Sequence, residues 1–497
     1  MGLVGILAGL AFLMALAFRG WTILLLAPAA AMVAAAFAAE PLLAHWTQTF
    51  MPAAAGFVAQ FFPLFLLGAL FGKLMDDSGS VAAIADFMTE TLGPKRAILA
   101  VVLAGALVTY GGVSLFVAFF VLAPMGLALF RAGGVPRRLL PAALALGTST
   151  FTMSALPGTP AIQNAIPMPF FGTDPFAAPG LGAIAAIVMF SLGMGWLTLA
   201  ESRARRLGEG FDGRLAQALS AAAPTPAERR STEAAAHDVV LRELATTARE
   251  FDPAEIDKGA PPSARPGVAA AALPLIVVIL VNLVVSQVVL PRFDADFLSE
   301  PRWGGATLAA VGGVWSVAVA LLCAIATLVA INRGRLTDLR ASVDSGATAS
   351  VLPVLSVASL VGFGAVVAAL PAFAVVREWV LGVGGGPLVS LAVATNILAA
   401  LTGSASGGMT IALEALGPTF MGIAAETGID PALMHRVAVI ASGTLDSLPH
   451  NGAVVTMLAV CGCTHRESYL DIVVVAVVAA LAALAVVIAL GSVAGSF

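Results

Sequence analysis

Charged residues are scarce in this 497-residue sequence, of which 11% is Asp, Glu, Lys or Arg and 59% is hydrophobic. The mean hydropathy of +0.98 is more than the core of a soluble protein can absorb. The net charge of -4 is small and spread over many loops, which argues against nucleic acid or an acidic partner. Lipid is therefore the expected solvent of this chain.

Cysteine is also rare, with three residues in the chain. Cys323 lies in an apolar stretch, whereas Cys461 and Cys463 form a Cys-x-Cys pair that packing explains better than zinc binding. The sequence lacks HExxH, GxSxG and any His-rich ligand set, which an intramembrane enzyme would need. We therefore expect no enzymatic activity, no metal site and no cofactor.

Long apolar stretches recur from Leu3 to Val493. At about 20 residues per crossing they could supply roughly twelve to fourteen spans. The first stretch has no basic segment before it and no clear cleavage site after it, so we expect a retained helix. The predicted fold class is an all-α polytopic membrane protein of a bacterial inner membrane.

A polar segment divides the sequence. Residues 201–266 hold 10 of the 25 Lys and Arg residues and 11 of the 29 acids, in a background of Ala and Pro that predicts a solvated linker. The other predicted parts are N-terminal membrane helices, a first membrane repeat, connecting membrane helices and a second membrane repeat, at residues 1–55, 56–200, 267–345 and 346–497.

Basic residues predict the orientation. Lys73, Lys95 and Arg203 are among those that fall on one side when the apolar segments are threaded in turn, and that side should be the cytoplasm. The linker then lies in the cytoplasm. A few basic residues, including Arg436, fall on the opposite side, so the bias is strong but incomplete.

Three sequence blocks recur in the same order, roughly 290 residues apart. The pairs are TMSALPGTPAIQNA from Thr152 with TLDSLPHNGAVVTM from Thr444, TYGGVS from Thr109 with TGSASGG from Thr402, and the segments around Pro63 and Pro353. By the charge bias, the half around Pro63 begins outside the membrane and the half around Pro353 begins inside. We therefore expect two inverted-topology repeats, 61–200 and 351–492, related by a twofold pseudo-axis in the membrane plane.

Four clusters of Gly, Pro and hydroxyl residues interrupt the spans, two as hairpin tips and two as breaks within crossing helices. Such backbone must face protein or a cavity, and helix N-termini exposed there attract carboxylates. A single Gly-Gly pair more often serves close helix packing, but the matching of clusters between halves favours a shared substrate site near the bilayer midplane. The expected substrate-binding residues are Gly111, Gly112, Ser114, Thr152, Ser154, Gly158, Thr159, Asn164, Thr402, Gly403, Ser404, Ser406, Thr444, Ser447 and Asn451.

Asp446 and His450 stand four residues apart in the last cluster. A carboxylate and an imidazole in an apolar stretch are costly unless they are paired, hydrated or functional. We expect them to form the ion-coupling centre, with a proton or a sodium ion as the coupling ion; a mutual structural hydrogen bond is the alternative. Glu414 also lies in a span, but without a polar cluster it ranks as a packing or cavity-edge residue.

The same motifs resemble the gluconate permease family of the ion transporter superfamily. The likeness rests on GKLMDDSGS at Gly72 to Ser80, on GGVSLFVAFFVLAPMGLALF after Tyr110, and more loosely on LTGSASGGMTIA from Leu401 and SGTLDSLPHNGAV from Ser442. The resemblance implies proton-coupled uptake of gluconate or related acids, an elevator mechanism and a homodimer. It covers both membrane halves and excludes the linker.

One segment departs from the gluconate pattern. Where those permeases have a His in a proline-rich segment, this chain reads SALPGTPAIQNAIP, which looks more like members described as hydroxybutyrate permeases. We therefore expect a symporter that imports a small hydroxycarboxylate such as 3-hydroxybutyrate or a gluconate-like sugar acid. An exporter or antiporter of an organic anion is the alternative, and an anion channel is a weaker one because paired inverted breaks fit a central site.

Overall fold

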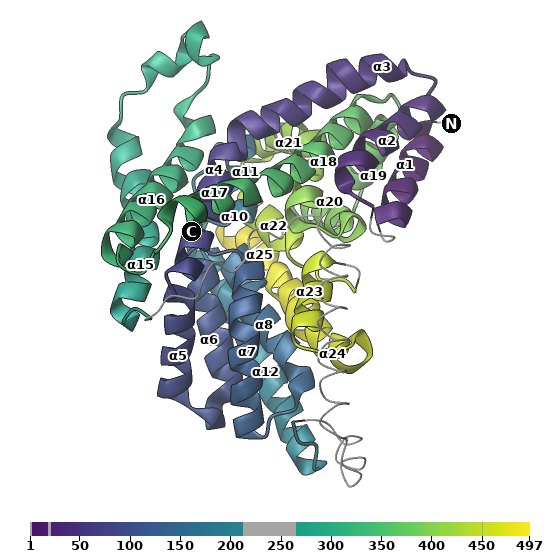
Figure 1. The fold of residues 1–497 in the computed structure, drawn as a ribbon. Helices are drawn as coiled ribbons and strands as arrows, with labels where there is room; N and C mark the ends of the chain where they lie inside the picture. The colour runs from purple at the N-terminus through teal and green to yellow at the C-terminus, as the bar shows by residue number, and fades with distance from the viewer. Residues whose placement is uncertain (1, 18–20, 212–264, 450) are drawn as a thin grey trace.

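A computed structural model describes residues 2–17, 21–211, 265–449 and 451–497 of the protein. The described chain is built from helices and the loops between them (Figure 1). Eight of these helices are long and apolar enough to cross a membrane, or nine if a bent pair at 80–110 is one span. The predicted all-α polytopic class is confirmed. The count is below the expected twelve to fourteen because several apolar helices are short.

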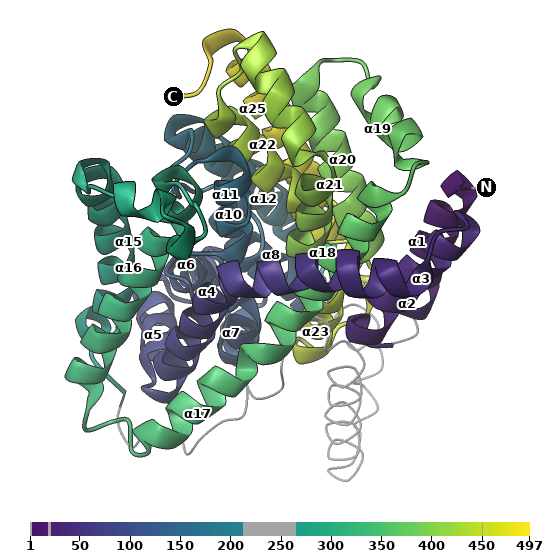
Figure 2. The same cartoon turned by 90° about the horizontal axis from the view of Figure 1, so that it is seen from above.

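The amino-terminal part ends in one long helix. α1 (Gly2–Ala17) packs against α2 (Ile23–Phe37), and a continuous helix over Leu42–Asp77 follows, whose main part is α4 (Met51–Asp77). Seen from above, α4 runs across the molecule from the N-terminal helices to α5 (Figure 2).

The first half consists of a hairpin and an interrupted helix. Its helices are α5 (Ser80–Leu92), α6 (Ala97–Tyr110), α7 (Leu115–Gly133), α8 (Leu140–Thr148), α9 (Phe151–Ser154), α10 (Ile162–Ala165), α11 (Pro167–Phe171) and α12 (Pro179–Arg206). α6 and α7 are the hairpin arms, and the chain from α8 to α11 is the interrupted helix. α12 continues to Arg206, so the first residues of the predicted linker at 201–266 are helical.

Two helices join the halves. α15 (Val268–Val284) and α16 (Leu308–Asn332) pack against each other, and α16 also contacts α4. They form one edge of the molecule, on the left of Figure 1.

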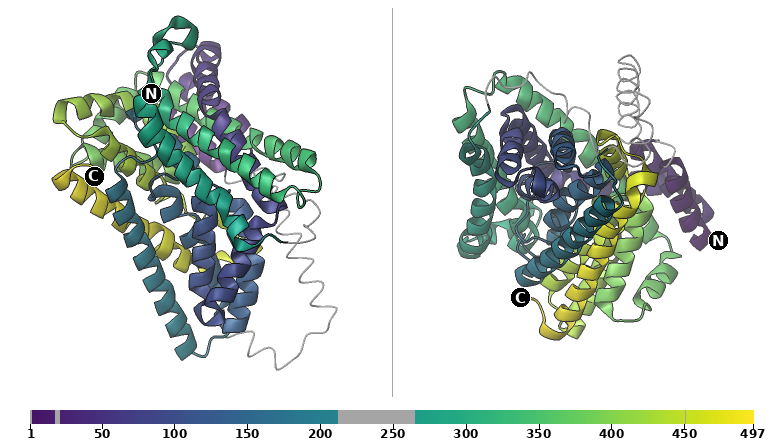
Figure 3. Two further views of the ribbon diagram at one scale, coloured as in Figure 1. Left: turned by 90° about the vertical axis from the view of Figure 1, so that its left-hand side faces the viewer. Right: turned by 90° about the horizontal axis from the view of Figure 1, so that it is seen from below.

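The second half repeats this order of elements. Its helices are α17 (Leu339–Ala349), α18 (Val351–Ala369), α19 (Phe373–Leu381), α20 (Pro387–Thr402), α21 (Ala405–Thr427), α22 (Pro431–Ser442), α23 (Gly452–Val460), α24 (His465–Ile472) and α25 (Ala479–Ala494). α20 and α21 form a hairpin, and the chain is interrupted between α22 and α23. α12 and α25 lie side by side, which brings the closing helices of both halves together (Figure 3).

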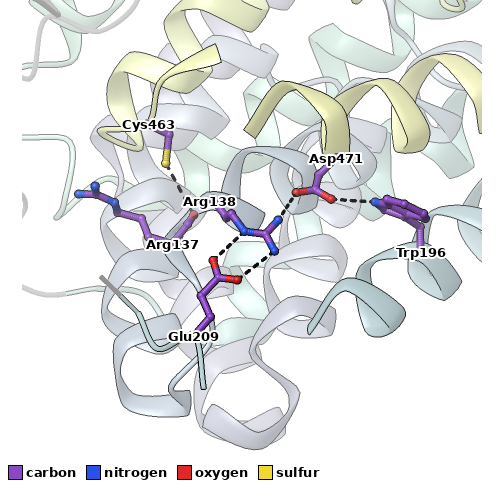
Figure 4. Close-up of polar contacts among 6 residues, drawn as sticks. All are labelled: Arg137, Arg138, Trp196, Glu209, Cys463 and Asp471. Atoms are coloured by element: carbon purple, nitrogen blue, oxygen red, sulfur yellow. Dashed lines mark hydrogen bonds and ion pairs between the residues drawn. The ribbon is translucent and has the colours of Figure 1, made fainter. Parts of the chain in front are cut away.

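A polar cluster joins the two halves (Figure 4). Arg138 binds Glu209 at 2.8 Å and Asp471 of α24 at 2.6 Å, and the indole N–H of Trp196 donates to the same aspartate at 2.9 Å. Because one arginine bridges two carboxylates from distant parts of the chain, the turn before α8, the segment after α12 and α24 are held together here.

Candidate substrate site at two helix breaks

The first hairpin tip contacts the first helix break. Thr109 donates to the hydroxyl of Thr152 at 3.2 Å, and the Tyr110 hydroxyl donates to the carbonyl of Pro157 at 2.8 Å. Gly112 has a φ of 99°, and a Cβ there would lie 2.7 Å from the Pro160 ring. Only glycine fits this position, for both reasons. The first and second clusters are therefore in direct contact.

The second tip and the second break meet in the same way. Asn451 caps α23 by accepting from the N–H of Ala453 at 2.7 Å, and its amide donates to the carbonyl of Gly403 at 2.7 Å. Ser404 caps α21, accepting from the Gly407 N–H at 2.9 Å. One asparagine thus closes a helix N-terminus and joins the third cluster to the fourth.

The two breaks also touch across the halves. A Cβ on Gly443, at the end of α22, would lie 3.0 Å from the Cβ of Ser154. His435 of α22 lies 3.2 Å from the Oδ1 of Asn164 through Nε2, and its Nδ1 lies 2.6 Å from the Thr173 hydroxyl. The four predicted clusters therefore form one connected region.

A cavity of about 190 Å³ lies beside this region. Its wall is made by α4, the first hairpin tip, the first break, the start of α18 and the start of α21. Of the predicted substrate-binding residues, Gly112, Ser114 and Ser406 line it. Its other polar lining residues are Thr109, Thr148, Gln163 and Ser350. Every residue that lines it is uncharged.

Comparison with known proteins agrees with this architecture. Residues 1–204 match the sequence model of the GntP family permeases. The chain is also 39% identical to the "Uncharacterized transporter YxjC" of Bacillus subtilis (strain 168) over 495 residues, which cover 98% of each chain. The protein belongs to the GntP permease family. It is thus a multi-pass membrane transporter of the bacterial inner-membrane type and not an enzyme.

Several predicted residues of this permease lie behind the cavity wall. Thr152 donates to the carbonyl of Gly147 at 3.0 Å, and Ser154 donates to that of Thr150 at 3.0 Å. Asn164 donates to the carbonyls of Thr159 and Pro175 at 3.1 and 3.0 Å. The remaining predicted residues outside the lining are Gly111, Gly158, Thr159, Thr402, Gly403, Ser404, Thr444, Ser447 and Asn451. These residues belong to the permease's breaks and hairpin tips but do not line its cavity.

Asp446 lies in the second break with 9% of its surface exposed. Its Oδ1 accepts from the Ser447 hydroxyl at 3.2 Å, and no ion pair involves it among the described residues. It does not line the cavity. His450 lies outside the described residues. Glu414 is half-buried in α21.

Sequence reasoning missed the role of α22 in the permease. The charge pattern predicts Arg436 to lie in a loop on the outer side, but its side chain is fully buried and reaches the first half. Orientation from charge counts treats every arginine as a loop residue. The signal that could have found Arg436 is its place within an apolar run, where a charge must be paired or functional. Gln163, within the recurring TMSALPGTPAIQNA block, was also passed over, although it lines the cavity.

Proposed function

We propose that this permease is a secondary active transporter that imports a small hydroxycarboxylate together with a coupling cation. The observation that carries the proposal is the uncharged cavity, which is lined by several hydroxyls and one amide among apolar side chains and is bounded by a hairpin tip and a helix break. The hydroxyls of Ser114 and Ser406 and the amide of Gln163 can donate to a carboxylate and exchange hydrogen bonds with a hydroxyl group.

The size of the cavity favours a short acid. Its volume of about 190 Å³ is below the ~300 to 1,000 Å³ of typical ligand pockets. Its apolar lining, which includes Leu64, Phe65 and Val357, suits a hydrocarbon end more than a chain of hydroxyl groups. We therefore favour 3-hydroxybutyrate over gluconate as the substrate type.

Coupling is assigned to Asp446 and His450, with a proton as the coupling ion. A buried carboxylate without an ion pair among the described residues is stable when it is protonated or holds a cation. Sodium is the other ion that an aspartate with hydroxyl and carbonyl neighbours could hold. The matching residue in the first half is Ser154, so coupling belongs to the second half.

We further propose that the two membrane halves are inverted repeats. The shared order of hairpin and interrupted helix supports this, as does the position of α6 and α7 below, and α20 and α21 above, the centre of Figure 1. An elevator mechanism and a homodimer complete the proposal, both by family resemblance. The proposal keeps a linker and connecting helices between the halves, although α12 runs into the predicted linker and α17 crosses the predicted end of the connecting helices.

Transport by purified protein in liposomes tests the proposal. Vesicles with an imposed pH gradient or an imposed sodium gradient receive 3-hydroxybutyrate, glycerate, lactate or gluconate. We expect 3-hydroxybutyrate to accumulate inside the vesicles when the proton gradient points inward, that is, when the outside is more acidic. Accumulation driven by an outward gradient would favour an exporter or antiporter instead, and equilibration without accumulation would favour a channel.

A further inference from the structure

Arg436 is the largest fully buried side chain of the described protein, and all of its hydrogen bonds go to backbone carbonyls. Its Nε and Nη2 donate to the carbonyl of Ala177 at 3.1 and 2.6 Å, and Nη1 donates to the carbonyl of Ala155 at 3.2 Å. Both acceptors belong to the first half, whereas Arg436 belongs to α22 of the second. None of the ion pairs within 4.0 Å among the described residues includes it.

The residues around the guanidinium are closely packed. A Cβ at Gly182 would lie 2.5 Å from the carbonyl oxygen of Ala155 and 3.2 Å from the Nε of Arg436. The guanidinium is linked to the cavity wall through the first break, because Ala155 lies in the segment between the cavity-lining Met153 and Pro160. A buried cation without an ion-pair partner is costly, so its retention calls for a function.

The compensating negative charge lies to one side. Asp174 acts on Arg436 electrostatically. It is half-exposed, and its two oxygens accept from the N–H of Phe176 at 2.7 Å and the amide of Gln287 at 2.9 Å. The positive charge is thus buried against Ala155, in the segment between two cavity-lining residues, while the negative charge is partly in solvent.

From this geometry we infer that Arg436 determines the anion specificity of the cavity, acting through the wall without touching the substrate. The inference rests on the proposed function, because it takes the ligand to be a carboxylate. A guanidinium that stays positive at every working pH attracts an anion in the cavity, while the hydroxyls that line the wall supply the hydrogen bonds.

The test compares an acid with its neutral amide. We would measure the affinities of 3-hydroxybutyrate and 3-hydroxybutyramide by calorimetry on the full chain in nanodiscs, for Arg436→Met, Arg436→Lys, Asp174→Asn and a control, Arg377→Met. Arg377 is an exposed arginine of α19. The readout is the acid-to-amide affinity ratio, with thermal unfolding to check the fold.

We expect Arg436→Met to lower the ratio on the order of tenfold, and Arg436→Lys to retain it within about threefold. Asp174→Asn should raise it roughly twofold, since it removes the compensating charge while its carbonyl oxygen can still accept from the Phe176 N–H. Arg377→Met should leave it unchanged. Equal loss of acid and amide in Arg436→Met would make the arginine a structural clamp and overturn the inference.

Asp174→Asn decides the case if Arg436→Met fails to fold, because a ratio that stays unchanged or falls in this surface variant also overturns the inference. A different result would concern the proposed function. If the unaltered protein binds none of the acids, the proposed function itself fails, whereas acid binding with ratios insensitive to these charges rejects the inference alone.

Discussion

The two helix breaks are similar in sequence but are held in different ways. The first is fixed by side chains from three parts of the chain: Tyr110 of its own half, Asn282 of α15, which donates to the Gly158 carbonyl at 3.0 Å, and Arg436 of the other half. The side-chain hydrogen bonds to the second break come from its own half, although α23 also packs on α7 and α8. Tyr469 and His465 of α24 bond to the carbonyls of Ser447 and Pro449 at 3.2 and 2.8 Å.

This difference suggests that the two breaks have different roles in transport. A break anchored from three sides is suited to be a fixed cavity wall, whereas a break anchored within its own half can move with that half. The second break also carries the carboxylate, Asp446, where the first has Ser154. The following experiments test this contrast, beginning with the largest expected effect.

Asp446→Asn should abolish gradient-driven accumulation while substrate exchange continues. A lone charge at a helix centre costs ~2.5 to 3.5 kcal/mol on insertion scales, so this carboxylate should be retained for coupling. Uptake under an inward pH gradient and counterflow between loaded liposomes measure the two activities. Glu414→Gln, a second intramembrane carboxylate in α21, is the control and should still accumulate substrate. Normal accumulation by Asp446→Asn would make the residue structural.

Gly408→Ala should destabilise the second hairpin by about 1 to 3 kcal/mol, because overpacking displaces a close-packed neighbour. The new Cβ would lie 2.3 Å from the Cα of Ala399, a backbone atom that has no room to move aside. Thermal unfolding in detergent measures the loss. Gly422→Ala in the same helix meets nothing within 4 Å and should stay within about 1 kcal/mol of the unaltered protein. Equal melting temperatures would show that the hairpin is loosely packed.

Asn282→Ala should lower stability by ~0.6 to 1.7 kcal/mol, the average and the maximum measured for hydrogen bonds between membrane helices. It removes the donor to the buried Gly158 carbonyl and releases one of the three anchors of the first break. If that break is a fixed wall, the KM for substrate should rise more than the rate falls. Ser316→Ala removes a bond within α16 alone and serves as the control. A reduced rate with unchanged KM would argue against a fixed wall.

The two tyrosines of the chain allow the finest comparison, since each bonds to one break. Tyr110→Phe and Tyr469→Phe each delete one hydroxyl and should cost about 0.5 to 1.5 kcal/mol. We expect Tyr110→Phe to change KM and Tyr469→Phe to change the transport rate, each by a few-fold, in steady-state uptake. The same kinetic effect from both would remove the distinction between wall and moving part.

The sequence predicted the breaks and the hairpins because the bilayer makes them conspicuous. Unpaired backbone is intolerable in hydrocarbon, so TYGGVS and SLPHNG within apolar runs indicate that the helix is interrupted inside protein. The local motifs predicted where the chain turns. They also identified Gly112, Ser114 and Ser406, which line the cavity.

The hydrogen-bond partners could not be predicted in this way. Thr152 and Ser154 have the composition of ligand donors, but their hydroxyls bond to carbonyls four or five residues earlier. Whether a hydroxyl faces a cavity or bonds to its own helix depends on the helix's rotation, which its sequence alone does not set. Arg436 was missed for a related reason, because its partner carbonyls are distant in sequence and backbone carbonyls carry no sequence signal.

The bond from Arg436 to Ala155 also determines when the protein can mature during synthesis. The two residues are 281 positions apart, so the first break is made long before its arginine. At ~5 to 20 residues per second, the ribosome needs roughly 15 to 60 seconds to reach α22. During that interval the carbonyls of Ala155 and Ala177 lack their final donor in the membrane. A nascent chain stalled before α22 should therefore expose its first break to proteases that the completed chain resists.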